Sequence, residues 1–179
     1  DFENELDIAS GWGSSNSAGG AWGIAKNPNG DGHAIYVMRN TNSGTTKLQY
    51  DTKDPGGNFV YVDVDYLSPK NERFEMFYFL VGENPAFKVV IGDDGALSYR
   101  GDDPSNVGLG RYTANEWHHM SFIIDKGNQT ITLYIDGELK VKDKGLRFPM
   151  EQFTTIRSYN QGTAFGSVYF DNLTICGSD

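Results

Sequence analysis

The chain begins with acidic residues whose spacing suits a two-carboxylate site. In the stretch "ENELDIAS", residues 3–10, Glu5 and Asp7 are two positions apart, and side chains at i and i+2 of a β-strand share a face. Retaining glycosidases use two carboxyl groups about 5 to 5.5 Å apart, one as nucleophile and one as acid/base. The stretch therefore raises the hypothesis of a hydrolase.

Two adjacent histidines are the other candidates for proton transfer. Histidine titrates near neutral pH and is the side chain most often used as a general base. Neighbouring residues of a strand point to opposite faces, so His118 and His119 cannot act together on one substrate. The pair does not by itself predict catalysis.

Aromatic residues outside the core are candidates for binding a sugar. The apolar faces of sugar rings stack on Trp and Tyr, while nearby amides, carboxylates and guanidinium groups bind the hydroxyls. In a β-sandwich most aromatic residues pack in the core, which is the competing interpretation for each of them. The candidate ligand-binding residues are Trp12, Trp22, Tyr61, Asp63, Arg157, Tyr159, Asn160 and Gln161.

Short strands must position these residues, because almost no segment has a helical period. Runs rich in Val, Ile, Tyr and Phe are separated by turns that contain Gly, Asn, Asp or Pro. The expected strands are 33–39, 46–51, 58–67, 73–82, 86–92, 96–101, 116–125, 129–137, 138–142, 153–159 and 166–175. The Gly-, Ser- and Asn-rich stretch 11–23 is expected to be a loop. This pattern predicts one all-β domain over residues 1–179, an antiparallel two-sheet β-sandwich of the jelly-roll type.

Alternation within the strands predicts which side chains enter the core. In 58–67 the valines and Tyr66 share one face, and Tyr61 and Asp63 share the other. The Asp-Gly at 136–137 supplies residues that tolerate a positive φ for a tight turn. The inward positions expected in the hairpin before it are Met120, Phe122, Ile124, Ile131, Leu133 and Ile135.

Charge and composition exclude several classes of partner. Lys plus Arg number 15 and Asp plus Glu number 24, for a net charge of −9. Nucleic acids and anionic membranes would be repelled, and the same surplus favours a neutral glycan over a uronic-acid polymer.

The single Cys176 cannot form an intrachain disulfide, and no apolar run of about 18 residues suggests a membrane span. No signal-peptide pattern is present, so we expect a mature chain or a module of a longer bacterial secreted or cell-surface protein, monomeric by itself.

The segment "EWHHMSFIIDKGNQTITLYIDGELK", 116–140, resembles the paired strands of the concanavalin A-like lectin/glucanase superfamily, especially its laminin G-like jelly rolls. That superfamily contains lectins, hydrolases, lyases and adhesins, so the resemblance implies a fold more narrowly than a function. The N-terminal stretch also resembles the Glu-x-Asp-x-x-Glu strand of laminarinase- and lichenase-type glycosidases. Ser10 stands where the last Glu of that motif would be, which weakens the hydrolase hypothesis.

The two ends of the chain carry a second resemblance. "DFE" and "SGW" near the start, and "VYFDNLTI" near the end, resemble the first and last strands of many bacterial carbohydrate-binding modules. In such modules these strands lie side by side, and acidic residues on them hold a structural calcium, which takes six to eight oxygen ligands. The resemblance implies a calcium site at Asp1, Glu3, Asp171 and Asn172. The alternative is that Asp171 only caps or bends the last strand.

The function expected from these observations is a non-catalytic carbohydrate-binding module. It would keep an attached catalytic or cell-surface module close to a polysaccharide by raising its effective concentration. Two alternatives stay open. A polysaccharide lyase or glycoside hydrolase on the same sandwich would need a cleft with clustered titratable groups. A structural or adhesive domain with a protein partner would present a flat apolar patch.

Overall fold

The computed structural model contains two seven-stranded antiparallel sheets that pack face to face, and none of the residues it describes is helical. It describes residues 12–16, 20–39, 45–70, 74–92, 94–102, 106–161 and 166–179. Within those ranges no helix is long and apolar enough to cross a membrane. The strands are β1 (Trp12–Asn16), β2 (Gly20–Lys26), β3 (His33–Arg39), β4 (Thr45–Asp51), β5 (Phe59–Leu67), β6 (Phe74–Val81), β7 (Asn84–Ile91), β8 (Ala96–Arg100), β9 (Val107–Arg111), β10 (His118–Asp125), β11 (Thr130–Ile135), β12 (Glu138–Gly145), β13 (Thr155–Gln161) and β14 (Gly166–Ser178).

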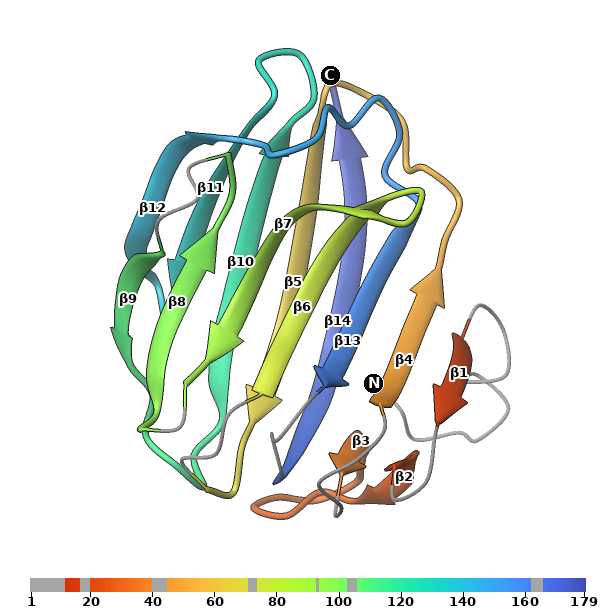
Figure 1. Cartoon of the computed structure of the whole chain (residues 1–179), viewed down its shortest axis with the longest axis vertical. Coiled ribbons are helices and arrows are strands. Elements are labelled where there is room, and N and C mark those ends of the chain that lie inside the picture. The colour runs from red at the N-terminus through yellow and green to blue at the C-terminus, as the bar shows by residue number, and fades with distance from the viewer. Residues whose placement is uncertain are drawn as a thin grey trace.

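The two sheets form the layers of the sandwich. Sheet A has the strand order β1-β4-β13-β6-β7-β8-β9, and sheet B has the order β12-β11-β10-β5-β14-β3-β2. Figure 1 looks onto sheet A, with sheet B behind it. Some neighbours are consecutive strands, such as β6, β7 and β8, whereas others come from distant parts of the chain, as in the pairing of β14 with both β3 and β5. The prediction of an all-β, antiparallel two-sheet jelly roll is confirmed.

Aromatic rings fill the space between the sheets. Phe79 of β6 is completely buried, and its ring stacks on Phe87 with centroids 4.2 Å apart. Phe122 from sheet B lies 4.7 Å from the same ring, so this contact joins the two layers. The inward positions predicted for β5, β10 and β11 are all buried, which confirms them: Val60, Val62, Val64, Tyr66, Met120, Phe122, Ile124, Ile131, Leu133 and Ile135.

The Asp-Gly turn between β11 and β12 has the backbone that the sequence predicts. Asp136 has a φ of 51° and Gly137 a φ of 77°. Two successive positive φ values are typical of the tight turn whose twist matches that of a hairpin. This turn brings Asp136 beside the start of β10, where its Oδ1 accepts a 2.8 Å hydrogen bond from the backbone N–H of His119.

The prediction of a loop over 11–23 is wrong for its described part. Residues 12–16 and 20–26 form β1 and β2, and the equally unpredicted β9 has the sequence VGLGR. All three strands lie at sheet edges, where a strand pairs on one side only and Gly or Ser is tolerated. Trp12 and Trp22 also pack against the core. This apolar contact stabilises β1 and β2 although their Gly and Ser content is typical of a loop.

The aromatic contacts predict a large loss of stability when Phe79 is truncated. Removal of a buried Phe ring costs about 3–5 kcal/mol in other proteins, and Phe79 lies between the two layers. We expect Phe79→Ala to lower the free energy of unfolding by an amount in that range, measured by urea denaturation. The control is Leu139→Ala, since Leu139 is exposed and should change stability by less than about 0.5 kcal/mol. Equal effects of the two substitutions would contradict this account of the core.

Candidate functional site

The residues predicted to bind a sugar lie on opposite faces of the sandwich. Arg157 and Tyr159 point outward from β13 in sheet A, where they alternate with buried residues. Tyr61 and Asp63 point outward from β5 in sheet B, opposite the buried valines. The structure brings together the members of each pair but separates the two pairs by the thickness of the molecule, so one binding face can contain only one of them.

The remaining predicted ligand-binding residues are not brought to either pair by described contacts. Trp12 and Trp22 are partly buried against the core, and the Trp12 ring packs 4.9 Å from that of Tyr50. Asn160 and Gln161 pair through the backbone of β13 with β4, but their side chains lie outside what the structure describes. A sugar-binding role for these four residues stays a prediction.

A row of polar and aromatic residues crosses the outer face of sheet A. The register places one outward residue of each of five adjacent strands directly opposite the next. Neighbouring strands are about 4.8 Å apart, so the row spans about 19 Å. Its members, in order from β4 to β8, are Gln49, Arg157, Tyr78, Lys88 and Arg100. We call these five residues the transverse row.

Arg157 is the most firmly held member of the transverse row. Its Nε and Nη2 donate to Gln49 Oε1 at 3.0 and 2.7 Å, and Nη2 lies 3.2 Å from Glu83 Oε2. The Arg157 side chain is only 11% exposed, whereas that of Glu83 is 85% exposed. Among the described residues Nη1 has no hydrogen-bond partner. The guanidinium is therefore oriented by neighbours and retains donors for a ligand.

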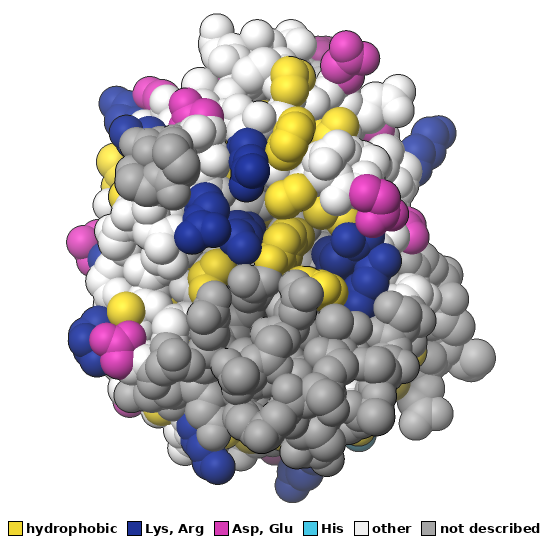
Figure 2. Space-filling model, viewed as in Figure 1, with side chains coloured by type: hydrophobic (Ala, Val, Ile, Leu, Met, Phe, Trp, Pro, Cys, Tyr) yellow, Lys and Arg dark blue, Asp and Glu magenta, His cyan; other side chains and the backbone are white. Residues whose placement is uncertain are grey.

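Two tyrosines form an aromatic platform in the middle of the face. Tyr78 and Tyr159 meet edge to face, with centroids 5.7 Å apart. Lys88 Nζ donates to Tyr78 Oη at 3.1 Å and lies 4.9 Å from the Tyr78 ring centroid. Figure 2 shows apolar side chains in a band down this face, with Lys and Arg side chains on both sides of the band. An apolar platform bordered by polar groups is suited to binding a sugar ring.

Four members of the transverse row are not among the binding residues predicted from the sequence: Gln49, Tyr78, Lys88 and Arg100. Each is an outward position in a strand that the sequence does predict, so alternation was the available signal. Alternation says that a residue points outward, but it does not say which outward residue of another strand lies opposite. That information is the register, and it came only from the structure.

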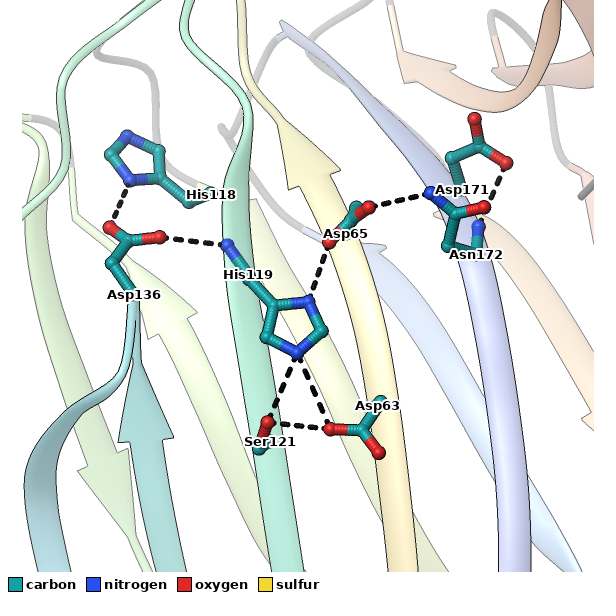
Figure 3. A network of polar contacts seen from close by, with 8 residues as sticks. All are labelled: Asp63, Asp65, His118, His119, Ser121, Asp136, Asp171 and Asn172. Carbon is teal, nitrogen blue, oxygen red and sulfur yellow. Dashed lines mark hydrogen bonds and ion pairs between the residues drawn. The ribbon is translucent and has the colours of Figure 1, made fainter.

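A second polar cluster lies on the outer face of sheet B (Figure 3). His119 of β10 contacts both outward carboxylates of β5: Nδ1 lies 2.6 Å from Asp65 Oδ1 and Nε2 lies 3.4 Å from Asp63 Oδ1. Ser121 Oγ donates to Asp63 at 2.5 Å and lies 3.1 Å from His119 Nε2. Asn172 Nδ2 of β14 donates to Asp65 Oδ2 at 2.7 Å. The cluster thus links three adjacent strands.

Ser121, His119 and Asp65 have the spacing of a nucleophile, a base and an orienting acid, but Asp63 changes their chemistry. The second carboxylate takes the hydroxyl hydrogen bond of Ser121 and lies beside His119 Nε2. An imidazole between two carboxylates is stabilised in its protonated form and is then unable to accept a proton from serine. A developing oxyanion at Ser121 would also face Asp63. The cluster is therefore a cross-strand clamp, and we assign it no catalytic role.

The two adjacent histidines point to opposite faces, as the sequence predicts. His118 turns toward the core, where its ring stacks on Tyr66 with centroids 5.4 Å apart and its Nδ1 lies 2.7 Å from Asp136 Oδ2. His119 points outward into the clamp. Burial raises the pKa of the Tyr66 phenol far above its ordinary value. The ring that stacks on His118 is therefore a neutral phenol.

The predicted calcium ligands are only partly described. Asp1 and Glu3, like Glu5 and Asp7, lie outside the described residues. Asp171 and Asn172 lie in an irregularity of β14, where Asn172 has a φ of 52° and its N–H bonds to Asp171 Oδ1 at 2.8 Å. Within the described ranges no three His, Cys, Asp or Glu residues are grouped to hold a metal ion. The calcium site stays a prediction.

Comparison with other proteins relates the chain to solved structures only. No protein-family model matches the sequence, and no curated protein matches it. A sialidase matches with a TM-score of 0.81 and 12% identity over 96% of this chain, which spans 17% of the sialidase chain. A carbohydrate esterase from Shiga toxin-encoding bacteriophage phi24B matches with a TM-score of 0.70 and 19% identity, over 99% of this chain and 95% of the esterase. An alginate lyase of Polysaccharide Lyase family 7 matches with a TM-score of 0.62 and 14% identity, over 85% of this chain and 81% of the lyase.

These matches confirm that the chain has the concanavalin A-like jelly-roll fold. The resemblance drawn from segment 116–140 is therefore correct at the level of the fold. At identities of 12 to 19% the similarity extends to the arrangement of the strands and not to the residues of a site. What the chain does must be argued from its own side chains.

The clamp on sheet B has a defined dependence on pH. Partial burial lowers the pKa of His119, but the hydrogen bond and charge of Asp65, together with those of Asp63, outweigh it and leave the pKa above its ordinary value. A pKa that is higher in the folded than in the unfolded state stabilises the fold fully below the unfolded value of about 6.5. This contribution is lost as the pH rises through the folded pKa. Because the His119 side chain is 46% exposed, solvent screening keeps the contribution small.

We therefore expect NMR titration to show that His119 protonates above its unfolded pKa of about 6.5, and that Asp65→Asn shifts the titration to lower pH. Urea unfolding of wild type and His119→Gln should differ more at about pH 5.5 than at about pH 8.5. A difference that grows with pH, or a His119 that titrates below the unfolded value, would contradict the clamp.

Proposed function

We propose that this chain is a non-catalytic carbohydrate-binding module and that the outer face of sheet A binds the glycan. The observation that carries the proposal is the transverse row, together with the Tyr78–Tyr159 platform at its centre. Its members come from five strands that each have buried neighbours in the core, so the face is rigid before a ligand arrives. A preformed surface loses little conformational entropy on binding.

The side chains of this face can make both apolar and polar contacts with a sugar. Tyr78 and Tyr159 offer apolar ring surface for the C–H faces of a pyranose. Gln49 and Arg157 supply an amide and a guanidinium already fixed by mutual hydrogen bonds, and such oriented polar groups determine which ligand is accepted. The length of the row, about 19 Å, suits an oligosaccharide that lies across the strands better than a single sugar.

The solved structures of the same fold support a role with carbohydrates. They include a sialidase, a carbohydrate esterase and an alginate lyase. The sialidase match covers 17% of that chain, which supports the idea that this sandwich can be one module of a longer protein. Attached to a secreted or cell-surface enzyme, the module would hold its partner near a polysaccharide.

A polysaccharide lyase is the second candidate, favoured by the contact between Lys88 and Tyr78. An ammonium group that donates to a phenol oxygen stabilises the phenolate, which is the form that abstracts a proton. Arg157 lies directly opposite Tyr78 in the register and would neutralise a uronate carboxylate during elimination. Incubation with uronate polymers distinguishes the two candidates. A lyase releases unsaturated ends whose ultraviolet absorbance grows with time and is lost in Tyr78→Phe, whereas a module binds and leaves the polymer intact.

Substitutions on the two faces test which one binds. We expect Tyr159→Ala to raise the apparent Kd at least about tenfold, equivalent to about 1.4 kcal/mol, for any glycan that the wild type binds. The apparent Kd is measured from the retardation of the protein in affinity electrophoresis. Tyr61→Ala, on the opposite face, should leave binding unchanged, and Tyr134→Ala on β11 is a further control in sheet B.

Each variant is first compared with wild type by thermal unfolding, so that a loss of fold is not scored as a loss of binding. If Tyr61→Ala abolishes binding while Tyr159→Ala does not, the site lies on sheet B and the proposal is wrong. If the wild type binds none of a panel of neutral and acidic polysaccharides, the carbohydrate-binding role itself is wrong.

A further inference from the structure

A pocket opens between the edges of the two sheets. One side is lined by β8 and β9 of sheet A, and the other by β5, β10, β11 and β12 of sheet B. β9 and β12 are edge strands of their sheets, and Figure 1 shows both at the same side of the molecule. No residue of the transverse row lines this pocket. Its lining includes Tyr66, Leu97, Leu109, His118, Ile135 and Asp136, and we call it the edge pocket.

The size and the floor of the edge pocket suit one small ring. Its volume is about 250 Å³, just below the range of about 300–1,000 Å³ that is usual for small-molecule sites. Leu97, Leu109 and Ile135 line it, and each is at most 5% exposed. These side chains of the core form a rigid apolar surface for the C–H face of a sugar. The pocket is too small for a polymer chain.

Tyr66 adds a hydrogen-bond donor to this floor. Its Oη is buried and has no hydrogen-bond partner among the described residues. Burial, followed by the charge of Asp136, raises the pKa of the phenol far above its ordinary value, so the group keeps its proton. A buried donor without an acceptor destabilises a protein, and buried polar groups are rarely left in this state. A ligand oxygen at the deepest point of the pocket supplies the missing acceptor.

Asp136 presents fixed acceptors at the rim of the edge pocket. Its Oδ2 lies 2.7 Å from His118 Nδ1, and its Oδ1 accepts the backbone N–H of His119 at 2.8 Å. Burial raises the pKa of this carboxyl group, but the hydrogen bonds from His118 and from the His119 backbone outweigh it and leave the pKa below its ordinary value. A carboxylate has about four lone-pair sites, and the Asp136 side chain is 51% exposed. It therefore still accepts hydrogen bonds from a ligand.

The other charged side chains around the edge pocket favour a neutral ligand. Arg111 Nη1 lies 3.3 Å from Asp94 Oδ2. Lys140 Nζ lies 2.6 Å from Glu138 Oε2. A ligand carboxylate would be repelled by Asp136, and a ligand ammonium group by Lys140. A sugar hydroxyl both donates and accepts, so it bonds to Asp136 and to Lys140 without displacing a partner.

We propose that the edge pocket binds one neutral sugar ring, with Asp136 accepting hydrogen bonds from its hydroxyls and the Tyr66 phenol donating to one of them. This second site goes beyond the proposed function, because it takes a free monosaccharide whereas the outer face of sheet A takes a chain. A ligand of this size makes few contacts, so its Kd is expected to be on the order of 1 mM.

The test is an NMR titration of the isotope-labelled full chain with glucose, galactose, mannose and xylose, each to concentrations well above that Kd. We expect at least one sugar to give saturable shifts of the backbone amides of Thr113, His118, Asp136 and Lys140. The uronate of that sugar should bind at least about threefold more weakly, because its carboxylate meets Asp136. Glycerol, which has hydroxyls but no ring, should give no saturable shift.

A substitution that fills the edge pocket assigns the shifts to it. Thr113 is exposed and lines the pocket, and only its backbone contacts His118. Thr113→Trp should therefore preserve those contacts while it raises the Kd at least about tenfold. The matched control is Thr174→Trp, at an exposed position of β14 on sheet B, which should leave the Kd unchanged.

Tyr66→Phe tests the buried donor. We expect it to raise the Kd about threefold to tenfold, the loss of one neutral hydrogen bond. It should not lower the midpoint of thermal unfolding of the free protein, because the phenol oxygen has no partner there. A lower midpoint would mean that the phenol is already bonded in the free protein. Either that result or an unchanged Kd overturns the role of Tyr66.

The outcomes separate this inference from the proposed function. If no sugar shifts the four amides, or if glycerol or the uronate binds as tightly as the sugar, the inference is wrong. If Tyr159→Ala weakens monosaccharide binding and Thr113→Trp does not, free sugars bind sheet A, and the edge pocket is overturned while the proposed function stands. If monosaccharide binding is lost only in Thr113→Trp and no polysaccharide retards the wild type, the proposed function fails and the edge pocket stands.

Discussion

The backbone pairing of β13 with β4 and β6 determines what sheet A presents to solvent. Side chains alternate along a strand, so once Leu48, Ile156 and Phe79 are buried in the core, their neighbours must point outward. The register then places Gln49, Arg157 and Tyr78 in one line. A shift of one residue would bury the charged residues and expose the apolar ones. The hydrophobic core therefore maintains the geometry of a site that it does not itself touch.

The two outer faces of the sandwich use their polar groups differently. On sheet B, the carboxylates of Asp63 and Asp65 are bound by His119, Ser121 and Asn172, so the polar groups satisfy one another across strands. On sheet A, Lys88 and Arg100 oppose each other and Arg157 pairs with a highly exposed Glu83. A cluster that satisfies itself stabilises the fold. On sheet A the Arg157 guanidinium retains donors for a ligand.

Much of the fold could be predicted because its signals are local. The alternation of valines in 58–67 and the Asp-Gly turn at 136–137 depend on neighbouring residues, and both predictions are confirmed. The edge strands β1, β2 and β9 escaped prediction because their Gly and Ser content is typical of loops. Only backbone pairing with an adjacent strand makes them strands.

The candidate site was predicted only in part, for a different physical reason. Arg157 and Tyr159 were recognised because they lie two residues apart in one predicted strand and therefore share a face. Lys88 and Arg100 belong to other strands, and their position opposite each other depends on long-range register. Tyr61 was placed with Tyr159 as a candidate because a sequence pattern does not tell one sheet from the other.

The most direct test of the central claim is a map of backbone amide chemical-shift changes as an oligosaccharide that binds is titrated into the isotope-labelled protein. The account predicts that the largest changes fall on β4, β13, β6, β7 and β8, centred on Gln49, Arg157, Tyr78 and Lys88, with little change on β5 and β10. Changes centred on Tyr61, Asp63 and His119, or confined to loops at the ends of the sandwich, would contradict it.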